Sequence, residues 1–235
     1  MSPHRTTATV AGVFFVVAAV AAVIGLALYQ PLLHDPAAYV SGSGNDTSIF
    51  LGAFFEVLVV VAVIGTAVSL FPVVRRQNEG FAVGYLAGRT VEGVVIAVGI
   101  ISLLTAVSLR QGYSATDAAA FVVAVKSLVA LHSWTFLFGP NIALGVNTTL
   151  LATLMLRSGL VPRLIPIIGL VGGPLIFVSG IAEMFGLYSQ VSALGATTAL
   201  PVFAWEMSLA AWLIVKGFRP SPILAAGIER TRMAA

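Results

Sequence analysis

The chain has 235 residues, of which 59% are apolar and only 9% carry a charge, with a formal net charge of +3. Ordinary globular proteins carry about 25% charged residues, so this chain has too few charged groups to cover a surface that faces water. This composition excludes a soluble protein and makes the lipid bilayer the surrounding solvent. The chain has no cysteine, which excludes disulfides, thiolate metal sites and cysteine nucleophiles.

Six segments are long and apolar enough to cross a membrane. A helix rises about 1.5 Å per residue, so about 20 residues span the roughly 30 Å of hydrocarbon. A cleaved signal peptide is the alternative interpretation of the first segment, but this segment is longer than the apolar run of a typical signal peptide. The sequence therefore predicts an all-α membrane protein, with one six-helix bundle over residues 1–235. The predicted spans lie near residues 8–29, 49–74, 81–109, 132–156, 166–188 and 194–215.

The region before the fourth predicted span is the hardest to divide. No strong helix breaker occurs between Ala118 and Leu156, and this stretch is too long for one ordinary span. Lys126 interrupts its apolar character. We therefore expect residues 116–130 to form a short amphipathic helix on the outer face of the membrane, with Trp134 at the interface.

The basic residues predict the orientation of the bundle. Cytoplasmic loops of membrane proteins are rich in Lys and Arg, so the positive charge is better explained by topology than by nucleic-acid binding. With the N-terminus inside, nine of the twelve basic residues are cytoplasmic, two are outside and Arg89 is within a span. Both termini, including a tail over residues 216–235, are therefore expected in the cytoplasm. The cytoplasmic set is Arg5, Arg75, Arg76, Arg157, Arg163, Lys216, Arg219, Arg230 and Arg232, and the outer set is Arg110 and Lys126.

Ionisable side chains within a span are costly and by default indicate function. Counting residues from the ends of the spans places Glu92 and Glu206 near the midplane of the membrane. Arg89 precedes Glu92 by three residues, so the two can pair on one helix face. Glu183 lies near the outer end of the fifth span, where it is expected to reach water. The candidate intramembrane polar cluster is Glu56, Arg89, Glu92, Asn141 and Glu206.

Two interpretations of this polar cluster stay open. In the first, Arg89 and Glu92, together with Glu206 and Asn141, form a buried network that only fixes helix register. In the second, three acids accompany one arginine, so burial keeps at least one glutamate neutral and ready to bind a proton or a cation. The second interpretation suits a proton- or cation-linked small-solute transporter or sensor. A regulatory subunit that binds a second copy or another membrane protein is a further alternative.

Small residues at helical spacing mark faces where helices can approach closely. Gly84 and Gly88 share a helix face with Glu92, which predicts that this glutamate points into the bundle. Gly169 and Gly173 form a similar pair in the fifth span. These four glycines are the predicted helix-packing positions.

The sequence gives little support for metal binding or catalysis. The three histidines, His4, His34 and His132, are predicted on opposite sides of the membrane, so no three-histidine zinc site can form. A rim cluster of His34, Asp35 and His132 is a weaker metal alternative. No serine lies in a nucleophile elbow, and no phosphate-binding loop occurs. We therefore expect no enzyme activity, no catalytic residue, no cofactor and no bound metal.

Five stretches of the chain, in their order and spacing, are similar to one family of bacterial membrane proteins. On these stretches the chain resembles the family called domain of unknown function 4386 (DUF4386) over nearly its whole length. The resemblance implies a six-helix protein of the bacterial cytoplasmic (inner) membrane. It implies no activity and no functional residues. The stretches are 79–92, 131–140, 157–163, 169–174 and 205–218.

Overall fold

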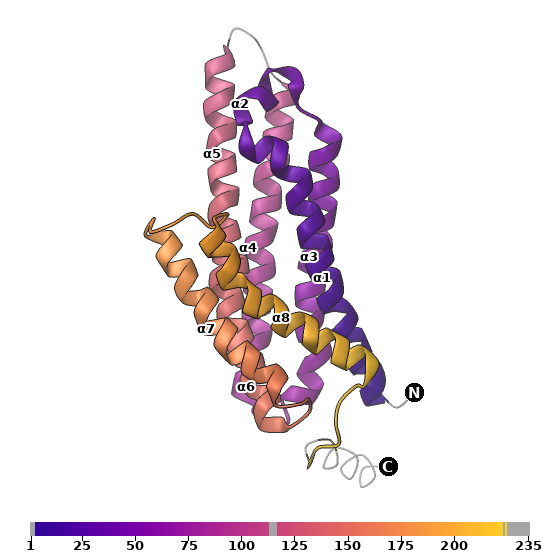
Figure 1. The fold of residues 1–235 in the computed structure, drawn as a ribbon. Coiled ribbons are helices and arrows are strands. Elements are labelled where there is room, and N and C mark those ends of the chain that lie inside the picture. Colours follow the sequence, from indigo (N-terminus) through magenta and orange to yellow (C-terminus); the bar gives the residue numbers. More distant parts are fainter. Residues whose placement is uncertain (1–2, 113–116, 223, 225–235) are drawn as a thin grey trace.

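A computed structural model describes residues 3–112, 117–222 and 224, and these residues form helices and no strand. Six helices in this part of the chain are long and apolar enough to cross a membrane, which confirms the predicted six-helix all-α bundle (Figure 1). Most of the predicted tail, residues 225–235, lies outside the described residues. The spans are α1 (Pro3–His34), α3 (Asp46–Val74), α4 (Glu79–Gln111), a composite of α5 (Ala118–Leu137), η3 (Phe138–Ala143) and α6 (Leu144–Ser158), then α7 (Leu164–Met184) and α8 (Ala193–Val215).

The fourth span differs from its prediction. Ala118–Ser158 forms one helix of 41 residues, so residues 118–130 are the first part of α5 and not a separate helix; residue 116 lies outside the described part. No glycine or proline interrupts α5, so the helix continues. The Ser127 and Ser133 hydroxyls donate to backbone carbonyls four residues earlier and so are satisfied within the helix. A helix of this length measures about 60 Å, roughly twice the hydrocarbon thickness. The upper half of α5 therefore extends beyond α7 and α8 (Figure 1).

A π-helical stretch, η3, joins α5 to α6 around Pro140. Proline has no N–H, so the Phe136 carbonyl loses its usual partner four residues along the helix. The Gln190 side chain, from the connection between α7 and α8, donates to this carbonyl at 3.2 Å. Short π-helical stretches are frequent at functional sites. The irregular backbone is therefore compensated by a neighbouring element, and the long helix stays continuous.

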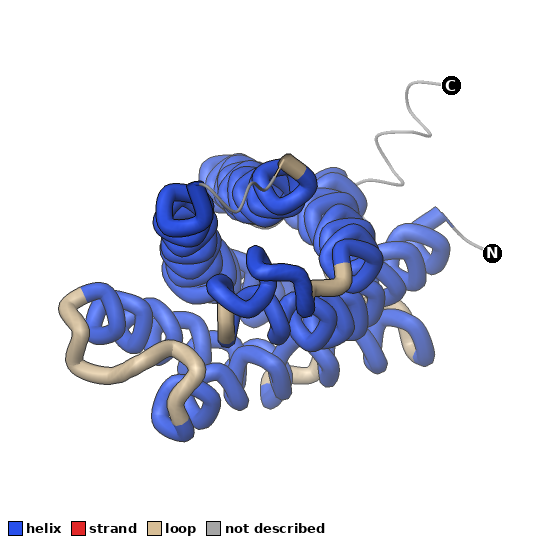
Figure 2. Tube along the Cα trace, turned by 90° about the horizontal axis from the view of Figure 1, so that it is seen from above, coloured by secondary structure: helices blue, strands red, loops and turns tan. Residues whose placement is uncertain are grey.

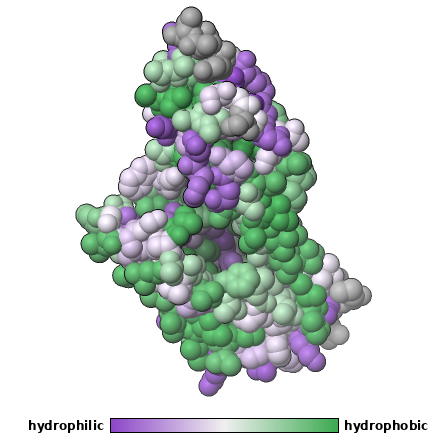
Figure 3. All heavy atoms as spheres, turned by 45° about the horizontal axis from the view of Figure 1, so that its top comes forward, coloured by the Kyte–Doolittle hydropathy of each residue, from purple (hydrophilic) through white to green (hydrophobic). Residues whose placement is uncertain are grey.

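The helices form two adjoining groups. Seen from above, α1, α3, α4 and α5 stand around a central axis, while α7 and α8 lie to one side and run obliquely (Figures 1 and 2). Neighbours in the chain pack together, and α8 crosses back to α1. The surface between the two ends is largely apolar (Figure 3). We call the end that carries the N-terminus and Arg75, Arg157 and Lys216 the basic end, and the opposite end the far end.

At the far end, a small set of polar contacts, here called the clamp, holds the connection between α1 and α3. This connection contains α2 (Pro36–Ala38) and η1 (Tyr39–Ser43). The Arg110 guanidinium donates to the Tyr39 carbonyl at 2.9 Å and pairs with Asp46 at 2.5 Å. Burial, followed by the hydrogen bond to Asp46, raises the pKa of the Tyr39 hydroxyl, so it stays a donor to that carboxylate at 2.7 Å. The clamp holds the connection against the end of α4.

Candidate functional site

One polar group in the bundle interior is centred on Arg89 of α4. Its Nη1 donates to both oxygens of Glu92, at 3.1 and 3.2 Å, and its Nη2 donates to Oε1 of Glu206 in α8 at 2.6 Å. Asn147 of α6 donates from Nδ2 to Glu92 Oε2 at 2.7 Å. We call Arg89, Glu92, Asn147 and Glu206 the Arg89 network. It connects three helices that are distant in sequence.

The Arg89 network is packed and charge-paired. Arg89 is 2% exposed and Glu92 is 3% exposed. The guanidinium carbon also lies 5.8 Å from the Phe15 ring centre and 5.7 Å from that of Tyr85, within cation–π range. Two carboxylates and two rings therefore surround one cation, an arrangement suited to holding helices together.

The structure does not bring Asn141 or Glu56 into the Arg89 network. Asn141 lies in η3 and donates from Nδ2 to Glu183 Oε2 at 2.8 Å. Ser179 donates to the other oxygen of Glu183 at 2.9 Å. The expectation that Glu183 reaches water is therefore wrong, because η3 and α7 cover it and leave 9% of the residue exposed. Both of its oxygens are satisfied by hydrogen bonds.

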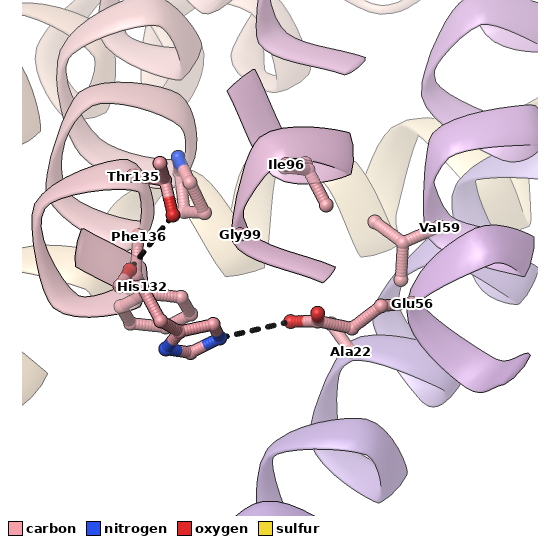
Figure 4. A pocket seen from close by; sticks show the side chains of 9 residues that line it. Ala22, Glu56, Val59, Ile96, Gly99, His132, Thr135 and Phe136 are labelled. Carbon is pink, nitrogen blue, oxygen red and sulfur yellow. Dashed lines mark hydrogen bonds and ion pairs between the residues drawn. The ribbon is translucent and has the colours of Figure 1, made fainter. Parts of the chain in front are cut away.

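Glu56 lines a cavity of about 40 Å³ between α1, α3, α4 and α5. Its Oε1 lies 3.7 Å from Nε2 of His132, too far for a hydrogen bond, and both side chains point into the cavity (Figure 4). Its Oε2 is buried and has no hydrogen-bond partner among the described residues. Glu56 is 9% exposed and His132 is 4% exposed. A carboxylate and an imidazole thus face each other across a space that neither fills.

Tyr29 of α1 completes this group. Its hydroxyl lies close enough to interact with the Glu56 carboxylate, but it makes no hydrogen bond of good geometry among the described residues. Its ring meets the His132 ring edge-on at 5.5 Å, and the Phe136 ring lies nearly parallel to the imidazole at 6.3 Å. We call Tyr29, Glu56 and His132 the Glu56 site. It holds one carboxylate, one imidazole and one phenol from three helices.

Three glycines make room for the side chains of the Glu56 site. A Cβ atom at Gly25 would lie 3.2 Å from the Glu56 side chain, and one at Gly52 would lie 2.6 Å from the Tyr29 ring. A Cβ at Gly99 would lie 2.5 Å from the Thr135 hydroxyl, on the α5 face that carries His132. Gly25, Gly52 and Tyr29 carry no recognisable signal in the sequence, because their contacts join residues far apart in the chain.

The four predicted packing glycines differ in how closely atoms of the neighbouring helix approach them. A Cβ at Gly88 would overlap the Asn147 amide oxygen, and one at Gly169 would lie 2.7 Å from the Trp205 ring. A Cβ at Gly173 would lie 2.8 Å from the backbone oxygen of Gly145. At Gly84 it would meet only Leu150, at an ordinary 3.4 Å. The crowded positions therefore lie where α6 meets α4 and α7, and where α7 meets α8.

The donor types limit what the Glu56 site can do. No group of three or more His, Asp or Glu side chains that could hold a metal ion occurs within the described residues. His132 faces Glu56, and His34 and Asp35 do not join it as cavity-lining residues. A carboxylate beside an imidazole and a phenol can exchange a proton and can attract a cation.

Comparison with known proteins places the chain in a family. No curated protein and no solved structure matches the chain. The model of one family matches residues 10–217, which is most of the chain and contains the Arg89 network and the Glu56 site. The chain therefore belongs to the family described as domain of unknown function (DUF4386) and is a multi-pass membrane protein of unknown biochemical function.

Proposed function

We propose that this protein binds a monovalent cation at Glu56, and that a proton on His132 competes with that cation. The observation that carries the proposal is a buried Glu56 oxygen that has no hydrogen-bond partner within the described part of the chain, in a cavity that His132 also lines. Such a site is a proton-linked cation sensor or carrier. The proposal assigns a binding role and not a catalytic one.

The competition follows from the cost of burying a charge. A buried carboxylate needs a counter-charge or hydrogen bonds. Protonated His132, 3.7 Å away, supplies the charge, whereas neutral His132 leaves the carboxylate uncompensated. A cavity of about 40 Å³ has room for about two or three water-sized groups, so a small cation fits. Around the cavity, α1 contributes the titratable Tyr29, α3 contributes Glu56 and α5 contributes His132, while the lining residues of α4 do not titrate.

The same reasoning assigns a structural role to the Arg89 network. Glu92 and Glu206 already share the Arg89 guanidinium, and Glu92 has a further donor in Asn147. Neither glutamate lines the cavity that contains Glu56. The cation site is therefore proposed at Glu56, and not at the midplane glutamates that the sequence favours.

Cation binding predicts a pH-dependent thermal shift of the purified protein. Binding to the folded state raises the unfolding temperature. At about pH 8, sodium, potassium or ammonium chloride should stabilise the native protein saturably relative to choline chloride at equal ionic strength. As the pH is lowered this response should shrink, because a proton on His132 supplies the counter-charge of Glu56 in place of the cation.

Matched variants test the assignment. Glu56→Gln should abolish the cation response, whereas Glu183→Gln, which removes a buried carboxylate with both oxygens hydrogen-bonded, should keep it. His132→Gln should weaken the pH dependence of the response, because only the proton on the Glu56 carboxylate then competes with the cation. A cation response that persists in Glu56→Gln, or that grows as the pH falls, would contradict the proposal.

We also propose that both termini face the cytoplasm across a bacterial inner membrane. The support is the concentration of Lys and Arg at the basic end. The chain has no cysteine, so a single introduced thiol is unique. In intact cells a membrane-impermeant thiol reagent should label Ser41→Cys at the far end but not Gln77→Cys at the basic end. The reverse labelling pattern would overturn this orientation.

A further inference from the structure

We infer that the ligand of the Glu56 site is an amphiphilic organic ammonium, with its charged head in the cavity and its apolar chain in the side opening between α1 and α5. The inference rests on the proposed cation binding at Glu56 and goes further by naming the chemical class of the cation. It is carried by the size of the cavity, the side on which it opens, and the atoms available to a cation there.

The cavity is open to the side of the bundle. Helix α1 packs against α3 and α8, and α5 packs against α4, so α3 and α4 form the back of the cavity, whereas α1 and α5 flank it. The space-filling view shows a hollow with hydrophilic atoms at its floor, with hydrophobic side chains beside and below it and hydrophilic ones above it (Figure 3). A ligand can therefore approach from the side, along the apolar surface that faces lipid.

The cavity is large enough for the charged head of the ligand but not for the rest of it. A volume of about 40 Å³ admits a head the size of an ammonium group, and any larger part must lie in the opening. The cavity-lining residues Ala22, Phe136 and Pro140 are exposed or half-buried and apolar. An alkyl chain placed there leaves water for an apolar environment, which stabilises the complex.

The donor set favours an ammonium over a bare metal ion. Hard metal cations require about six oxygen ligands, and an ammonium group requires only about three acceptors. The site offers about three acceptors, which are the Glu56 carboxylate, the Tyr29 hydroxyl and the oxygen of Thr135, whose own proton goes to the His132 carbonyl. The rings of Tyr29 and Phe136 beside the imidazole supply aromatic surface, which attracts organic cations. The chemistry of the cavity thus matches a weakly hydrated head.

The test is a calorimetric titration of the purified protein with ammonium, ethyl-, butyl- and hexylammonium chlorides at about pH 8. Affinity should rise by about three- to fourfold for each added methylene, as for apolar groups leaving water. Butanol and hexanol, which lack the charge, should not bind measurably. Lowering the pH should weaken hexylammonium binding to the native protein, because a proton on His132 supplies the counter-charge of Glu56 in place of the ammonium head.

Two variants test separately how the charged head and the alkyl chain of the ligand contribute to binding. Glu56→Gln should abolish binding of the whole series, whereas Ala22→Phe, which fills the opening, should remove the gain in affinity with chain length. Equal affinity for ammonium and hexylammonium in the native protein would overturn the amphiphile inference and leave the cation site standing. Hexylammonium binding that is unchanged in Glu56→Gln would overturn the inference as well. Failure of every cation, ammonium included, to bind the native protein would instead refute the proposed function itself.

Discussion

Replacing Arg89 by glutamine is expected to lower the free energy of unfolding by about 3–5 kcal/mol, the largest effect of any single substitution considered for this protein. The substitution removes the cation that pairs with Glu92 at 3.1 Å and with Glu206 at 2.6 Å. Two carboxylates then face each other inside the bundle without a counter-charge. Breaking a buried pair from one side costs more than the pair itself contributes, because the remaining charge stays buried.

Unfolding in mixed detergent micelles, followed by far-ultraviolet circular dichroism, measures this loss. Arg76→Gln is the matched control, because Arg76 is an exposed arginine at the end of α3 and its loss should change stability by less than about 0.5 kcal/mol. Adding Glu206→Gln to Arg89→Gln should restore part of the stability by removing one uncompensated charge. Equal stability of Arg89→Gln and Arg76→Gln would show that the Arg89 network does not hold the helices together.

The second large effect is expected at the contact between α6 and α7. A Cβ at Gly173 would lie 2.8 Å from the Gly145 backbone oxygen and 3.0 Å from the Thr149 backbone nitrogen. Backbone atoms cannot rotate away as a side chain can, so Gly173→Ala must push the two helices apart. We expect a loss of about 1–3 kcal/mol in the free energy of unfolding.

Gly84→Ala provides the comparison for Gly173→Ala. Gly84 also lies within a membrane helix, but its added Cβ would meet only the Leu150 side chain at 3.4 Å. Its stability should be unchanged or slightly raised, since alanine favours helix more than glycine does. The same detergent unfolding experiment compares both variants. Equal effects of the two substitutions would contradict the close backbone contact between α6 and α7.

The candidate site was predictable from the sequence only in part. The three-residue spacing of Arg89 and Glu92 anticipates their contact, because neighbours on a helix face are set by the helix itself. Asn141 was predicted in the wrong cluster, since it donates to Glu183, and Asn147 contacts Glu92 instead. Between α5 and α6, each turn of the π-helical stretch Phe138–Ala143 contains more residues than an α-helical turn. The α-helical period of about 3.6 residues therefore does not predict which face of α6 points into the bundle. Helix facing beyond Pro140 therefore required the structure.

The number and type of the spans were determined by the sequence alone. A bilayer imposes a length and an apolar character on each helix, and each helix satisfies its own backbone hydrogen bonds, so these properties are local. Which polar side chains meet was decided only by the tertiary structure. Tyr29, Glu56 and His132 come together because glycines at positions 25, 52 and 99 allow α1, α3, α4 and α5 to approach closely. Helix rotation and tilt depend on the packing of all neighbours at once, which no single segment of the sequence contains.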